Sequence, residues 1–231
     1  MSKNIVYPAY LSEQNIQALL KQIHKDELKT IATELGINMQ LLSPKLALAP
    51  NDKQQALFAQ ALVVATYLEK YYPNQIGTID EARKYVKGTL TMFSHFLHSR
   101  TGKPDLAYFS GSTSQTILSL AGSASSVYVP TQTEIANKNG SRLASTLPFL
   151  LEMLGSDMEI HSARFYMDDP DMNLALAFYS IRALQENARP SVSYSFFARV
   201  QLDSTYLKAD LQPSKHIVLA APLYIVNTVR V

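Results

Sequence analysis

Two histidines, His95 and His98, are the residues whose spacing most directly suggests metal chemistry in this chain of 231 residues. In the helix that we expect over residues 78–100, a separation of three places both imidazoles on one side, where they could supply two metal ligands. No carboxylate accompanies them within the same helical turn, whereas a zinc site needs a third and usually a fourth ligand. We therefore expect no metal centre, and His95 and His98 remain only the candidates for one.

Three aspartates, Asp168, Asp169 and Asp171, form the densest acidic cluster and could be imagined to hold Mg²⁺ or Ca²⁺. The spacing of a calcium loop fails, because no glycine and no terminal glutamate follow in register. Asp169 followed by Pro170 is instead typical of a helix start, as cap and first-turn residue. We therefore interpret the cluster as helix initiation and expect no cation site there.

Two runs rich in glycine and serine, at 110–114 and 122–126, could offer backbone amides to a phosphate. The first lacks the Gly-Lys-Ser/Thr ending of a phosphate loop, and neither places a serine between two glycines as a nucleophile elbow requires. The absence of cysteine excludes thiol catalysis, disulfides and cysteine-based metal sites. We therefore predict no catalytic residues, no cofactor and no enzymatic activity. A hydrolase or metalloenzyme ranks third among the functions that we consider.

Basic and aromatic residues are mixed between residues 164 and 199, a pattern that can grip single-stranded nucleic acid by phosphate contact and stacking. Most of these aromatic residues fall on the expected buried faces, and the net charge of +2 gives no general attraction for nucleic acid. Nucleic acid is therefore a partner that we consider but do not favour. The candidate nucleic-acid-binding residues are Arg164, Arg182, Arg189 and Arg199.

The clearest structural pattern is a strand from Ser191 to Asp203, in which apolar and polar residues alternate. Only Phe197 breaks this alternation. A strand of this length is unstable alone and needs partner strands and a covering layer. The best partner is a second strand over 216–229, which is rich in β-branched residues.

Apolar residues recur at helical spacing through most of the chain before these strands. We expect two long helices, over 52–72 and 78–100, that form an antiparallel hairpin, because a wide apolar arc and a capping-box spacing mark them. Shorter helices are expected over 112–120, 143–154 and 169–189. The predicted fold is therefore α+β and mainly helical. Its N-terminal two thirds are helical, and a small antiparallel or mixed sheet is formed by C-terminal strands at about 191–203 and 216–229.

Three segments are expected along the chain. Residues 1–42 form a pair of short amphipathic helices that could serve as a docking appendage. Residues 43–51 are a connector because two prolines interrupt them, and residues 52–231 are a single globular α+β domain. The apolar face of the helix pair supplies the predicted partner-docking residues, which are Ile16, Leu19, Leu20, Ile23, Leu28, Ile31 and Leu35.

Thirteen tyrosines and a charged fraction of only 17% predict a weakly charged surface of the kind found in protein interfaces. Our leading hypothesis is a non-catalytic structural or adaptor subunit of a multiprotein assembly, for example an accessory component of a bacterial secretion complex, with other protein subunits as partners. The alternative is a nucleic-acid-coating protein, such as a viral coat or nucleocapsid subunit. A small-molecule substrate is not expected. Because no apolar run is long enough to span a membrane, we expect a cytoplasmic protein with no transmembrane segment.

Overall fold

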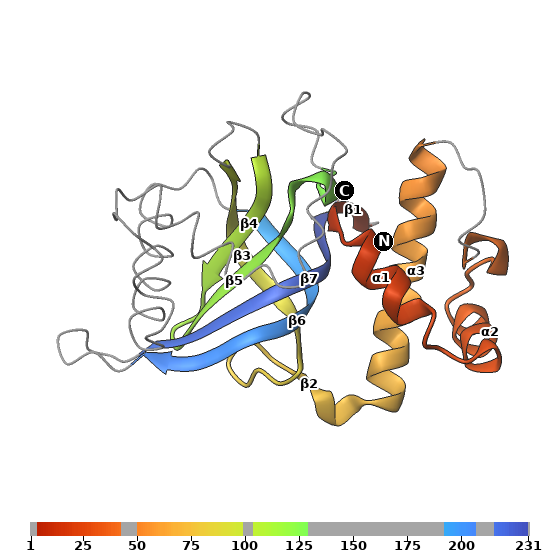
Figure 1. Ribbon diagram of the computed structural model, residues 1–231, viewed down its shortest axis with the longest axis horizontal. Helices are drawn as coiled ribbons and strands as arrows, with labels where there is room; N and C mark the ends of the chain where they lie inside the picture. The colour runs from red at the N-terminus through yellow and green to blue at the C-terminus, as the bar shows by residue number, and fades with distance from the viewer. Residues whose placement is uncertain (1–3, 43–49, 99–103, 129–191, 207–214, 231) are drawn as a thin grey trace.

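The computed structural model of the protein describes residues 4–42, 50–98, 104–128, 192–206 and 215–230. These residues form a layer of helices beside a seven-stranded mixed sheet (Figure 1). The helices are α1 (Glu13–Leu20), α2 (Lys25–Glu34) and α3 (Pro50–Tyr71), with short 3₁₀ turns η1 (Met39–Leu42), η2 (Pro73–Gln75) and η3 (Ala124–Ser126). The strands are β1 (Asn4–Leu11), β2 (Ile76–Gly77), β3 (Tyr85–His98), β4 (Pro104–Ser112), β5 (Thr116–Ser123), β6 (Val192–Tyr206) and β7 (Lys215–Arg230).

Five of the strands close into a barrel. Strand β3 pairs with β6 along its first half and with β4 along its second half, while β4 pairs with β5 and β6 pairs with β7. The parallel pairing of β5 with β7 completes the circle. A five-stranded Greek-key barrel is the architecture of the OB-fold. Strands β1 and β2 lie outside the circle, beside β7 and β3 respectively.

Side chains fill the interior of the barrel. Strand β6 contributes Tyr194, Phe196 and Ala198, which are alternate positions and therefore share one face of the strand. Three residues from outside the five strands join the same buried cluster: Ala9 and Tyr10 of β1 and Ile79 of the segment that follows β2. The interior is therefore a packed core.

Phe197, the residue that breaks the alternation of β6, belongs to a second buried cluster between the barrel and the helices. It shares this cluster with Val64 of α3, Ile16 of α1 and Leu223 of β7, and all four side chains are buried. The helical layer covers this part of the outer face of the barrel. An apolar residue is therefore needed there on the face of β6 that otherwise carries polar side chains.

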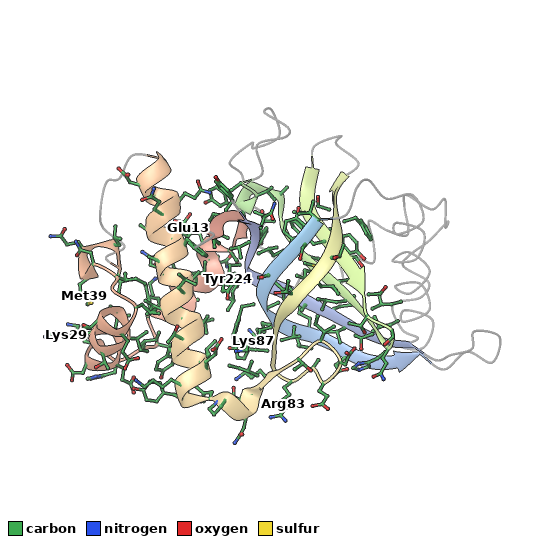
Figure 2. All side chains as sticks on the ribbon, turned by 180° about the vertical axis from the view of Figure 1, so that it is seen from behind. Glu13, Lys29, Met39, Arg83, Lys87 and Tyr224 are labelled. Atoms are coloured by element: carbon green, nitrogen blue, oxygen red, sulfur yellow. The ribbon has the colours of Figure 1, made fainter. Side chains whose placement is uncertain are left out.

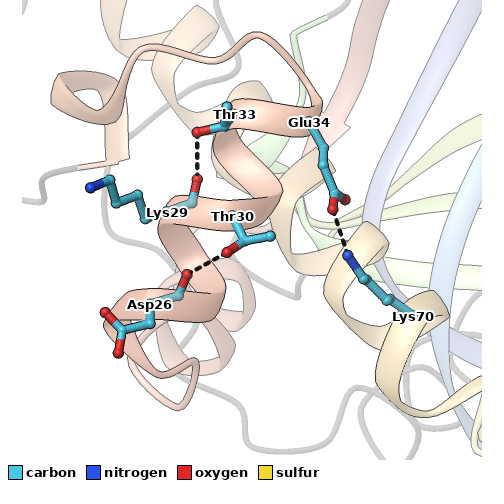
Figure 3. A network of polar contacts seen from close by, with 6 residues as sticks. All are labelled: Asp26, Lys29, Thr30, Thr33, Glu34 and Lys70. Atoms are coloured by element: carbon cyan, nitrogen blue, oxygen red, sulfur yellow. Dashed lines mark hydrogen bonds and ion pairs between the residues drawn. The ribbon is translucent and has the colours of Figure 1, made fainter.

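Helix α2 is tied to α3 by an ion pair. The ammonium of Lys70 lies 2.6 Å from Oε1 of Glu34, and this contact raises the pKa of Lys70 (Figure 3). Within α2, the hydroxyls of Thr30 and Thr33 donate to carbonyl oxygens four residues earlier, at 2.9 and 2.8 Å (Figure 3). Because the ion pair is largely exposed, it contributes less to stability than the burial of Ile31, which belongs to the cluster beneath the helices.

The expected mainly helical fold is wrong. Residues 78–100, expected as a long helix, contain β3, and residues 112–120, expected as a short helix, contain most of β5. The expected helical hairpin is therefore absent, and β1 near the N-terminus was not anticipated. The spacing of Thr78 and Glu81 reflects a local turn, in which the Glu81 amide donates to the Thr78 hydroxyl at 3.3 Å. A capping bond of this kind also occurs in turns and does not by itself predict a helix.

Other predictions from the sequence pattern are confirmed. The helix expected over 52–72 is α3, the two short N-terminal helices are α1 and α2, and the two C-terminal strands are β6 and β7. Most of the expected connector, residues 43–49, and the helices expected over 143–154 and 169–189 lie outside the described residues. Among the helices of the described part of the chain, none is long and apolar enough to cross a membrane.

Gly122 gives a test of how tightly β1 is packed against the barrel. A Cβ atom at Gly122 would lie 2.1 Å from the hydroxyl oxygen of Tyr10. Tyr10 is 2% exposed, packs edge-on against Phe109, and forms hydrogen bonds with Ser12 and Ser126, so its ring cannot move away freely. We expect Gly122→Ala to lower the free energy of unfolding by about 1–3 kcal/mol, as overpacking does.

Urea unfolding of four proteins checks this expectation: the wild type, Gly122→Ala, Tyr10→Ala and the double variant. Once Tyr10 is shortened to alanine, the added methyl group has space. Gly122→Ala should therefore hardly change the free energy of unfolding of the Tyr10→Ala variant. Additive losses of stability would contradict the proposed packing.

Candidate functional site

A groove of about 510 Å³ opens on the outer face of the first half of β3. It lies between the segment that follows α3, strand β3 and strand β6, and we call it the β3 groove. Its volume is within the range of protein sites that hold a ligand. Figure 2 labels three of its lining residues, Arg83, Lys87 and Tyr224, along the boundary between α3 and the barrel.

The alternation of β3 places the polar residues of the groove. Lys87 and Thr89 are exposed, whereas Val86 on the same strand is buried inside the barrel. The pairing with β6 brings Ser195 opposite Thr89, and their hydroxyl oxygens are 2.8 Å apart. The groove therefore contains the paired hydroxyls of Thr89 and Ser195, and the cation of Lys87 comes from two residues earlier on β3.

Positive charge in the groove comes from Arg83 and Lys87. The Lys87 ammonium lies 3.0 Å from Oε1 of Glu69 on α3, but both side chains are nearly half exposed, so an incoming anion can compete with this pair. Arg83 donates to the carbonyl of Asn74 at 3.1 Å and has no carboxylate partner among the described residues. Glu81 is the one carboxylate of the lining.

Tyr224 adds a neutral hydroxyl to the groove. Burial, followed by the nearby charge of Glu69, raises the pKa of Tyr224 to about 12. The phenol therefore keeps its proton at neutral pH and can donate a hydrogen bond. Together with the cations and the hydroxyls of β3 and β6, it gives the groove an excess of hydrogen-bond donors, which suits an anionic ligand.

A second cavity of about 230 Å³ lies between α1, α3 and the start of β3. We call it the tyrosine pocket, because Tyr67, Tyr72 and Tyr85 line it. The ring centroids of Tyr67 and Tyr72 are 5.8 Å apart. The hydrogen bond between these two phenols, with smaller effects of burial and of the Glu27 charge, raises the pKa of Tyr67 to about 12. The Lys84 ammonium lies 5.9 Å from the centroid of the Tyr85 ring, within the range of a cation–π contact.

The candidate metal ligands are not on a helix. His95 and His98 lie in the second half of β3, where they pair with Tyr108 and Pro104 of β4. The helical spacing that would give them one shared side therefore does not apply. The described residues contain no group of three or more histidine, aspartate or glutamate side chains arranged to hold a metal ion.

The sequence did not indicate a polar cluster that lies near the end of β6 and the start of β7 and also includes Asp80 and Thr113. The imidazole Nε2 of His216 contacts a carboxylate oxygen of Asp203, and the Thr113 hydroxyl donates to Asp80 at 2.6 Å. The hydrogen bond from Thr113 is the main cause that lowers the pKa of Asp80, and the charge of His216 adds to it. Because Thr116, beside Asp80, is opposite His216 in the β5–β7 register, only the folded barrel brings these residues together.

One candidate nucleic-acid-binding residue is described. Arg199 is exposed on β6, opposite Tyr85 of β3. The other three candidates, Arg164, Arg182 and Arg189, lie outside the described residues.

The residues predicted for partner docking mostly face the body of the protein. The side chains of Ile16, Leu20, Ile23 and Ile31 are buried in the cluster beneath the helices, and Leu19 and Leu28 are partly buried against it. Leu35, which is 40% exposed, is the one clear exception. In this fold a partner therefore has little access to the apolar face of the helix pair.

One family model matches residues 6–228, which include both the helices and the barrel, and its description is a family of unknown function. No curated protein and no solved structure matches the chain significantly.

Proposed function

Because this chain belongs to the DUF7019 family, whose function is unknown, we propose a role from the site itself: a non-catalytic adaptor subunit of a cytoplasmic multiprotein assembly that binds an acidic segment of a partner protein in the β3 groove. The observation that carries this proposal is the position of Arg83 and Lys87 in one open groove with the hydroxyls of Thr89 and Ser195. A guanidinium suits carboxylates because it offers paired donors in a fixed plane.

The shape and the chemistry of the groove support binding more than bond-making. The groove follows a strand, so an extended peptide can run along it. Its titratable lining residues are two cations, one carboxylate and a tyrosine with a raised pKa. General acid–base catalysis at neutral pH is better served by histidine or by a carboxyl of matched pKa.

Nucleic acid is the less favoured ligand. In an OB-fold barrel, oligonucleotides bind the outer face of the second and third strands, which are β4 and β5 in this barrel. Here Tyr108, Ser110 and Ser119 on β4 and β5 are at most 1% exposed. Along β3 and β6, Tyr85 and Phe197 are also buried, so they offer no platform on which bases could stack.

A fluorescently labelled peptide of alternating glutamate and glycine tests the proposal by fluorescence anisotropy. We expect the full chain to bind it, and we expect Arg83→Gln and Lys87→Gln each to weaken binding about two- to fivefold, as the loss of one exposed charge contact does. Lys29→Gln is the matched control, because Lys29 is an exposed cation on α2, away from the groove (Figure 2). Binding should weaken as salt rises, since exposed charges are screened.

Three results would count against the proposal. The first is no binding of the peptide, and the second is equal weakening by Lys29→Gln and the two groove variants. The third is preferential binding of a single-stranded oligonucleotide, with a steep salt dependence, which would favour the nucleic-acid-coating alternative.

A further inference from the structure

The two cavities are lined by neighbouring residues of the same two segments. Gln75 lines the tyrosine pocket and the next residue, Ile76, lines the β3 groove. In the same way, Arg83 lines the groove while Lys84 and Tyr85 line the pocket. A ligand that extends along the groove past Arg83 therefore reaches the pocket within a few residues.

The tyrosine pocket has a mixed lining, in which three tyrosine rings lie beside the polar side chains of Gln22, Gln75 and Lys84. Val64 and Leu68 of α3 are buried and Tyr85 is 4% exposed, while Gln22 and Lys84 at the rim are exposed. The tyrosine rings offer a surface on which one aromatic side chain can pack, and the polar groups beside them can bond with its polar edge. Aromatic residues are the side chains that most often fill such pockets at protein interfaces.

Lys84 indicates which charge the ligand carries beside its aromatic side chain. It lies over Tyr85 and has no carboxylate partner among the described residues, so an acidic residue beside the ring could pair with it. A bound cation would instead be repelled by Lys84. We propose that the acidic partner segment carries an aromatic side chain, which anchors in the tyrosine pocket while its carboxylates bind Arg83, Lys84 and Lys87. This inference rests on the proposed function.

Two labelled acidic peptides that differ only in one tryptophan or alanine at the end nearest the pocket test the anchor. The chain contains no tryptophan, so the emission of the peptide tryptophan reports only on the ligand. We expect the tryptophan peptide to bind about tenfold more tightly than the alanine peptide, a typical gain for a buried aromatic anchor. Its emission should also shift to shorter wavelength on binding, because the indole leaves water.

Tyr72→Ala and Tyr71→Ala are a matched pair of variants. Both tyrosines are 41% exposed and adjacent, but only Tyr72 lines the pocket. We expect Tyr72→Ala to remove the gain given by tryptophan, so that the two peptides bind this variant with equal affinity. Tyr71→Ala should retain the gain, and its partner Tyr67 remains in place.

The outcomes separate this inference from the proposed function. Equal binding of both peptides, or a tryptophan gain that survives in Tyr72→Ala, would overturn the aromatic anchor and leave acidic docking in place. Failure of both peptides to bind would overturn acidic docking itself. A peptide with tryptophan but with glutamines in place of the glutamates should bind more weakly than the acidic one. Unchanged affinity would show that the carboxylates add nothing to binding, and it would contradict both acidic docking and the role given to Lys84.

Discussion

Phe197→Ala is expected to lower the free energy of unfolding by about 3–5 kcal/mol, the usual loss for a buried phenylalanine. Phe197 is fully buried between the barrel and the helical layer. Its ring centroid lies 5.7 Å from that of Tyr85 and 6.3 Å from that of Tyr224. Alanine would leave a cavity where three aromatic rings now pack, at the boundary that also forms one side of both proposed binding cavities.

Urea unfolding followed by circular dichroism measures this loss. Phe197→Leu, which keeps most of the apolar volume, should lose clearly less, and Tyr7→Ala should change little because Tyr7 is 54% exposed on β1. If Phe197→Ala loses no more stability than Tyr7→Ala, the helical layer does not depend on this contact.

The cluster around Phe197 also connects the walls of the two cavities. Leu68 and Tyr85 line the tyrosine pocket and are part of that cluster, and Tyr224 packs against the cluster and lines the β3 groove. Residues that shape the cavities are thus fixed by the burial that holds the helices to the barrel. Side chains held in this way lose less conformational freedom when a ligand binds.

The sequence was informative where one side of an element faces water. Strand β6 has exposed Ser193 and Arg199 between buried or partly buried residues, so its alternation is visible. Strand β3 is different: Tyr85 and Val86 are both buried, as are Met92 and Phe93, because both faces of the strand are covered at these positions. Without alternation, an apolar run of this length is as compatible with a helix as with a strand.

Strand β5 was missed for a related reason. Its residues from Thr116 to Gly122 are all buried, including the polar Ser119. The sequence pattern predicts a short helix over 112–120, but these residues continue as a strand in which the Ser119 hydroxyl forms a 2.8 Å hydrogen bond with Tyr108. A hydrogen bond of this kind depends on a residue of the neighbouring strand, and the local sequence pattern does not reveal that neighbour.

The β3 groove could not be assembled from local patterns either. Thr89 and Ser195 are 106 residues apart, and only the register of β3 with β6 joins them. The local signal that was available is the basic group Arg83, Lys84 and Lys87, whose three cations fall within five residues. The helix expected over this segment would also gather these residues on one side. It would not bring Ser195 of β6 beside them, which the register of β3 with β6 does.

Alkaline unfolding is the second large effect that the structure predicts. Tyr10 and Tyr108 are buried, and burial raises the pKa of each from 10.0 to about 12 despite hydrogen bonds that oppose the shift. Above pH 10 the unfolded chain loses these protons while the folded protein keeps them up to about pH 12. The unfolded state then binds fewer protons, so stability falls as pH rises through this range. The contribution is fully present below pH 10, and each tyrosine accounts for a loss of about 2 kcal/mol by pH 12, where the folded tyrosine is itself half ionised.

The free energy of unfolding in urea, measured in steps between pH 10 and pH 12, tests this expectation. Tyr108→Phe should reduce the steepness of the fall, because one phenol with a raised pKa in the folded protein no longer titrates in the unfolded chain. At neutral pH the free energy of unfolding of this variant should be lower by only about 1 kcal/mol, because the hydrogen bond between Tyr108 and Ser119 is lost. Tyr7→Phe is the control, since Tyr7 is exposed and should leave the slope unchanged. An equal slope in Tyr108→Phe and wild type would mean that Tyr108 ionises in the folded protein as easily as in the unfolded chain, and that the face of β4 which carries it is open to water.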